Sequence, residues 1–84
     1  MVMPIVERRT EFDKSVQKLK DGLLREKVHK QIAKIIQDPE LGKPMMYARK
    51  GTREVYIPPF RLSYAYLAEE NKIILLDLYH KDDQ

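Results

Sequence analysis

Residues 52–81, TREVYIPPFRLSYAYLAEENKIILLDLYHK, contain three stretches with the composition of β-strands. Each is rich in β-branched and aromatic residues, and they span residues 52–57, 60–67 and 72–79. Pro58-Pro59 separates the first two, and 69–71 (EEN) separates the last two. Connections this short join antiparallel neighbours, so the sequence predicts a three-stranded antiparallel run.

Alternation along these stretches predicts which side chains face the core. Successive side chains of a strand point to opposite faces. The middle stretch therefore places one apolar set on one face: Phe60, Leu62, Tyr64 and Tyr66. The last stretch is expected to add Ile74, Leu76 and Leu78. The other face is predicted to be open and polar, with Glu54, Tyr56, Arg61, Ser63, Asp77, Tyr79 and Lys81.

The first half of the chain predicts one strand and two helices. Residues 3–8 are short, apolar and β-branched, as in an edge strand. Apolar residues then recur at helical spacing from a capping-box-like start at Thr10 and Asp13. A second apolar stripe begins after Gly22 and ends near Asp38, because a following proline disfavours helical geometry. Residues 40–51 are expected to form a loop.

This order of elements predicts an α+β fold. The strand and the helical hairpin would be followed by the antiparallel run, and all strands would form one sheet with the helices on one face. A chain of 84 residues holds one small core, so residues 1–84 are expected to form a single domain. Two separate cofactor and substrate lobes are thereby excluded.

Composition excludes several further classes. The chain has no cysteine, which removes disulfide scaffolds and thiolate metal sites and favours the cytoplasm. The two histidines, His29 and His80, have no matching carboxylate spacing, so no metal and no cofactor are predicted. No apolar run is long enough to cross a membrane. A net charge of +3 slightly favours a polyanionic partner.

Several local sequences resemble the RelE/ParE superfamily of toxins from type II toxin–antitoxin modules. They cover nearly the whole chain: FDKSVQKL at 12–19, IQDP at 36–39, LGKP at 41–44, GTREVYI at 51–57, FRLSY at 60–64 and ILLDLYHK at 74–81. The order of the last three is the most distinctive feature. The resemblance implies the same α+β fold, with one strand and two helices before the antiparallel run.

The resemblance also implies a function and a set of partners. RelE-like members are mRNA interferases, endoribonucleases that repress translation by cutting mRNA at the ribosome, whereas ParE-like members poison gyrase. Both are held silent by a cognate antitoxin protein. The expected partners are therefore an antitoxin, the ribosome and mRNA, with no membrane and no small-molecule cofactor.

Carried over to this chain, the family pattern implies three site residues. Arg61 in FRLSY matches the arginine that holds the scissile phosphate in RelE-type nucleases. Lys81 matches a second basic position, and His80 resembles a histidine that some members place beside it. The basic pair that the family carries on the preceding strand is replaced by Thr52 and Glu54, and no tyrosine follows Lys81.

The chemistry of RNA cleavage suggests roles for the remaining candidates. Attack by a 2′-hydroxyl needs a general base, a general acid and fixed positive charge, and it needs no metal ion. Arg61 and Lys81 supply charge. The candidates for the proton transfers are Glu54, Tyr56 and His80. The RNA backbone is expected to contact Arg49, Lys50 and Arg53. Because the basic pair is missing, a ParE-like or catalytically degenerate toxin that acts by protein binding remains the alternative.

Overall fold

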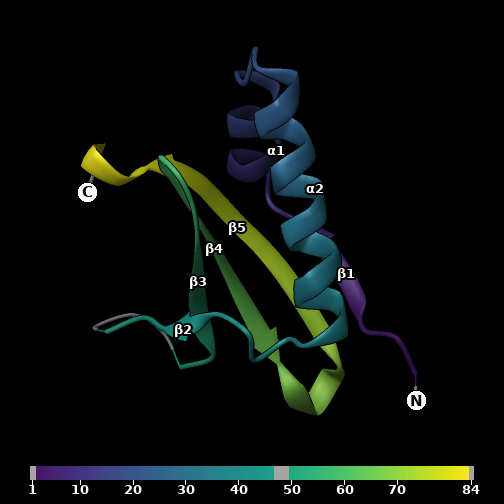
Figure 1. Ribbon diagram of the computed structural model, residues 1–84. Helices are drawn as coiled ribbons and strands as arrows, with labels where there is room; N and C mark the ends of the chain where they lie inside the picture. Colours follow the sequence, from purple (N-terminus) through teal and green to yellow (C-terminus); the bar gives the residue numbers. More distant parts are fainter. Residues whose placement is uncertain (1, 47–49, 84) are drawn as a thin grey trace.

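The computed structural model describes residues 2–46 and 50–83, whose strands form one five-stranded sheet in the order β1-β5-β4-β3-β2 (Figure 1). The strands are β1 (Ile5–Arg8), β2 (Lys43–Pro44), β3 (Thr52–Ile57), β4 (Phe60–Leu67) and β5 (Lys72–His80). Strands β3, β4 and β5 are antiparallel neighbours, and β1 pairs with β5 in parallel. The predicted α+β class and the three-stranded run are confirmed.

Two helices, α1 (Thr10–Gln17) and α2 (Gly22–Gln37), connect β1 to β2. Helix α2 begins at Gly22, one residue before the predicted start, and the Asp21 carboxylate caps it by accepting hydrogen bonds from the amides of Leu23 and Leu24. Helix α1 has no such cap: Thr10 is already helical, so the expected capping box is wrong. Neither helix in the described part of the chain is long and apolar enough to cross a membrane.

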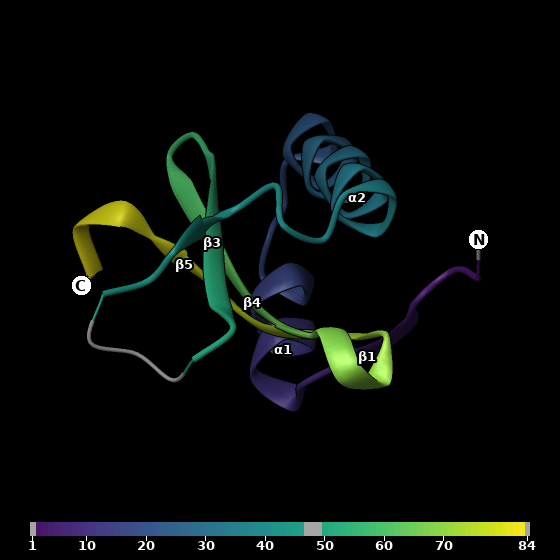
Figure 2. The ribbon, with the colours of Figure 1, turned by 90° about the horizontal axis from the view of Figure 1, so that it is seen from below.

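The core lies between the helices and one face of the sheet. Helix α1 packs against β5 and α2 against β3, and the view from below separates the two helices (Figure 2). Three strands and both helical segments contribute buried apolar side chains: Phe12, Leu19, Val28, Ile35, Val55, Ile57, Leu62, Tyr64, Ile73, Leu75 and Leu78. The opposite face is left uncovered by the helices.

A β-bulge in β5 changes the faces predicted for that strand. Ser63 pairs with Asp77 but the next residue, Tyr64, pairs with Leu75, so Leu76 is an extra residue. The core therefore receives Ile73 and Leu75 before the bulge and Leu78 after it. The expectation that Ile74, Leu76 and Leu78 share the apolar face is correct for Leu78 alone, because strict alternation stops at the bulge.

Hydrogen bonds of Tyr64 hold residues 39–42, which precede β2, against the core. The buried Tyr64 hydroxyl donates to the carbonyl of Pro39 and accepts the amide N–H of Gly42, both at 2.8 Å. Burial raises the pKa of the Tyr64 hydroxyl, which keeps it protonated for this donation. The expected loop over 40–51 contains the short strand β2, which pairs with β3.

Replacement of Gly42 by alanine is expected to destabilise the protein by about 1–3 kcal/mol, because the core has no room for the added methyl group. A Cβ at Gly42 would lie 2.8 Å from both the Glu54 carbonyl oxygen and the Tyr64 hydroxyl. Gly22→Ala is the matched control, since nothing lies within 4 Å of a Cβ there. Thermal unfolding of both variants measures the difference, and equal melting temperatures would contradict it.

Strand β1 covers only the first half of β5. Its last residue, Arg8, pairs with Leu75, and Glu7 forms an ion pair of 2.7 Å with Lys72. This contact lowers the pKa of the Glu7 carboxyl and raises the pKa of the Lys72 ammonium. Beyond Leu75 the strand is flanked by α1, where the Ser15 hydroxyl donates to Asp77 at 3.1 Å.

Candidate functional site

Three neighbouring strands bring a carboxylate, a guanidinium and a phenol together on the uncovered face. Glu54 comes from β3, Arg61 from β4 and Tyr79 from β5. The Arg61 Nη1 atom donates to Glu54 Oε1 at 3.3 Å, and the Tyr79 hydroxyl donates to Glu54 Oε2 at 2.9 Å. Both oxygens of the carboxylate are thus held by donors from other strands.

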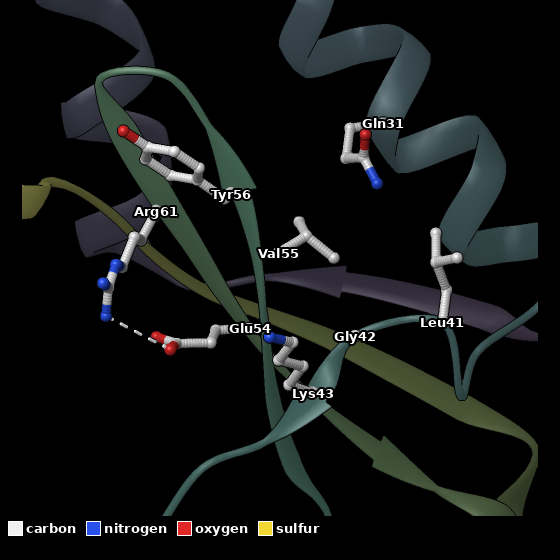
Figure 3. A pocket seen from close by; sticks show the side chains of 8 residues that line it. All are labelled: Gln31, Leu41, Gly42, Lys43, Glu54, Val55, Tyr56 and Arg61. Atoms are coloured by element: carbon white, nitrogen blue, oxygen red, sulfur yellow. Dashed lines mark hydrogen bonds and ion pairs between the residues drawn. The ribbon is translucent and has the colours of Figure 1, made fainter.

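The cluster borders two hollows of the surface, of about 430 and 710 Å³, that share Lys43, Glu54 and Arg61. Figure 3 shows the smaller one, in which the ion pair lies on one side of β3 while Val55 and Gln31 lie toward α2. The Glu54 and Arg61 side chains are 24% and 33% exposed. A solvent-borne ligand can therefore reach both.

Tyr56 and Lys81 extend the cluster along the same face. Tyr56 is the cross-strand partner of Arg61, and its side chain is exposed. The Lys81 ammonium lies 6.0 Å from the centre of the Tyr56 ring, at the limit of a cation–π contact. Four of the five predicted catalytic residues, Glu54, Tyr56, Arg61 and Lys81, thus gather on one side of the sheet, with Lys81 in the short 3-10 helix Lys81–Asp83 that follows β5.

His80, the fifth predicted catalytic residue, lies apart from this cluster. Its ring makes an edge contact with Phe60, with the ring centres 5.5 Å apart, and Phe60 packs against the core. Its Nδ1 atom accepts the amide N–H of Asp82 at 3.2 Å. The structure therefore places the imidazole on the helix side of β5 rather than beside Glu54.

Arg53, predicted to bind RNA, is engaged within the protein. Its Nη1 atom donates to the carbonyl oxygens of Glu40 at 3.1 Å and Gly42 at 2.7 Å. Its cross-strand partner is the buried Tyr64, so the side chain lies on the core side of β3. These contacts hold the segment before β2 in place and give no geometric support to RNA binding.

The other two predicted RNA-binding residues precede β3. Lys50 is exposed at the turn that leads into the strand. Arg49 lies outside the described residues. Within residues 2–46 and 50–83, no group of three or more His, Asp or Glu side chains is arranged to hold a metal ion.

Tyr79 is the one residue of the Glu54–Arg61–Tyr79 cluster that is absent from the site residues predicted from the sequence. The sequence predicts its face correctly, but the family resemblance, whose stretch ILLDLYHK contains it, assigns no role to this position. Its place opposite Arg61 depends on the register of β4 with β5, which the bulge sets and the sequence does not reveal. Two side chains on opposed positions of one face are in contact range.

The protein is thus a small α+β domain with a polar cluster on the face of strands β3, β4 and β5 that the helices leave uncovered. No protein-family model and no curated protein sequence matches the chain significantly. Solved structures do match it. A chain of the intact E. coli RelBE toxin–antitoxin complex superimposes with a TM-score of 0.79 at 14% identity, over 92% of this chain and 95% of that one.

Two further structures agree. A RelBE toxin–antitoxin complex from Mycobacterium tuberculosis matches with a TM-score of 0.75 at 24% identity, over 95% of this chain and 100% of that one. The E. coli DinJ–YafQ toxin–antitoxin complex matches with a TM-score of 0.78 at 16% identity, over 98% and 97%. The chain therefore has the fold of the RelE toxins, and the resemblance in its sequence is confirmed at the level of the fold.

Proposed function

We propose that this protein is the toxin of a type II toxin–antitoxin module and that it cleaves mRNA at the ribosome, which represses translation in the cytoplasm. The observation that carries the proposal is the cluster of Glu54, Arg61 and Tyr79 on the uncovered face. It combines a proton acceptor with a phosphate-binding cation. The shared fold with toxins of known complexes supports the same assignment.

The cluster contains groups suited to cleavage by the 2′-hydroxyl. Arg61 binds the scissile phosphate, because its planar fork matches two phosphate oxygens. Glu54 takes the proton of the 2′-hydroxyl as the 2′-oxygen bonds to phosphorus. The bond to the 5′-oxygen then breaks, and Tyr56 beside Lys81 is placed to give that oxygen a proton. The products are a 2′,3′-cyclic phosphate and a 5′-hydroxyl.

One observation favours the alternative, a toxin that acts by protein binding alone. The Glu54 carboxylate offsets the charge of Arg61 at 3.3 Å. Glu54 and Thr52 also occupy the positions where the resemblance implies a basic pair. A face with this charge balance attracts phosphate less strongly than one with two further cations. The target of such a toxin would be gyrase or another protein.

Primer extension on a translated message separates these two functions. The wild-type protein is expected to produce new 5′ ends within the message when ribosomes are translating it. The same message without ribosomes should stay intact. If a folded wild-type protein stops growth and leaves translated messages uncut, protein binding is the better assignment.

The proposed antitoxin partner has its own test. Expression of the chain alone should arrest a translating host, and co-expression with the product of an adjacent reading frame should restore growth. An antitoxin segment that folds on binding can cover the exposed face of a toxin this small. A chain that is harmless alone and binds no neighbouring product would contradict the assignment as a toxin.

A further inference from the structure

We propose that Tyr79 is a positioning residue that fixes the Glu54 carboxylate for proton transfer, a role that rests on the nuclease function proposed above. The Tyr79 hydroxyl donates to Oε2 of Glu54 at 2.9 Å, whereas Arg61 donates to Oε1. The two oxygens therefore have different donors, which come from different strands.

The two contacts differ once a phosphate enters the site. A phosphate bound by Arg61 competes with Oε1 of Glu54 for the Nη1 donor, whose contact with Oε1 is 3.3 Å long. The contact from Tyr79 to Oε2 does not involve Arg61, so it keeps the carboxylate in place while Oε1 accepts the proton of the 2′-hydroxyl. Without Tyr79, Glu54 would lose its orientation at the moment when it is needed.

The bulge in β5 is what brings Tyr79 to this face. Leu75 faces the core, so strict alternation from Leu75 would turn Tyr79 toward the core as well. The extra residue, Leu76, reverses the order, so that Leu78 is buried and Tyr79 lies opposite Arg61. Bulges beside functional sites commonly re-aim a side chain in this way.

Tyr79→Phe is the first variant to test, because it removes the hydroxyl and keeps the ring. In single-turnover cleavage on programmed ribosomes, its maximal rate should fall about tenfold or more, in keeping with the cost of a misplaced catalytic group. The toxin concentration for half-maximal rate should stay within about twofold, since Arg61 still binds the phosphate.

Tyr66→Phe is the matched control, because it removes a hydroxyl from the core-facing side of β4. Its rate is expected to equal that of the wild type. Equal maximal rates for Tyr79→Phe and the wild type, in a wild type that cleaves, would overturn the positioning role alone. Absence of cleavage by the wild type would instead remove the nuclease function, and the positioning role with it.

A cycle with Glu54→Ala, which removes the acceptor of the Tyr79 hydrogen bond, separates positioning from an independent effect. If Tyr79 acts through Glu54, adding Tyr79→Phe to Glu54→Ala should change the residual rate less than twofold. Thermal unfolding of the wild type, the two single variants and the double variant provides a readout without substrate. The effects of the two substitutions on the free energy of unfolding should be non-additive. Additive effects in the unfolding cycle would overturn the contact on which the proposal stands.

Discussion

Arg61→Ala is expected to lower RNA cleavage by about two orders of magnitude or more, the usual effect of removing one preorganised group that stabilises transition-state charge. Its guanidinium lies on the uncovered face, one-third exposed, and contacts Glu54 at 3.3 Å. The same substitution should cost at most about 1 kcal/mol of stability, because partly exposed ion pairs contribute little. Glu54 keeps its hydrogen bond from Tyr79 in the variant.

Arg61→Lys is the matched variant for this prediction. An ammonium keeps the charge but loses the fork that binds two oxygens, so cleavage should recover only in part. Toxicity, primer extension and thermal melts are measured on the same preparations. A large fall in melting temperature for Arg61→Ala would show that the residue is structural, and undiminished toxicity of a folded variant would favour the protein-binding alternative.

The fold could be predicted from the sequence because local signals agree with the tertiary structure. The antiparallel strands are short and separated by Pro58-Pro59 and by a short polar stretch, as expected from the sequence. The bulge at Leu76 had no such signal, since an unbroken apolar run fits either alternation. Strand β2, of two residues, is too short to show a period and depends on pairing with β3.

The residues of the candidate site could be predicted where the face of a strand alone determines whether a side chain joins the site. Period-two alternation places Glu54, Tyr56 and Arg61 together, as the structure does. The same alternation sets His80, between Tyr79 and Lys81, on the opposite face, where its ring contacts Phe60, and only the family resemblance made it a candidate for the site. Alternation could not show that carbonyl groups before β2 engage Arg53, because that contact depends on the path of a loop.

Phe12→Ala should have the opposite signature to Arg61→Ala: a large loss of stability from a core residue that is not part of the proposed site. Phe12 is 1% exposed and lies in α1, which packs on β5. Truncating a buried phenylalanine costs about 3–5 kcal/mol, through lost burial and the cavity left behind. For a domain of this size that lowers the melting temperature by roughly 12–40 °C.

Helix α1 packs on β5, the strand that carries Tyr79, but Phe12 itself is not part of the site. Phe12→Ala should therefore reduce toxicity only by unfolding the protein, and toxicity should recover at low temperature. Leu23→Ala is the control, because that leucine is 70% exposed and its loss should change stability by no more than about 0.5 kcal/mol. A Phe12→Ala protein that melts like the wild type would place the core elsewhere than between α1 and β5.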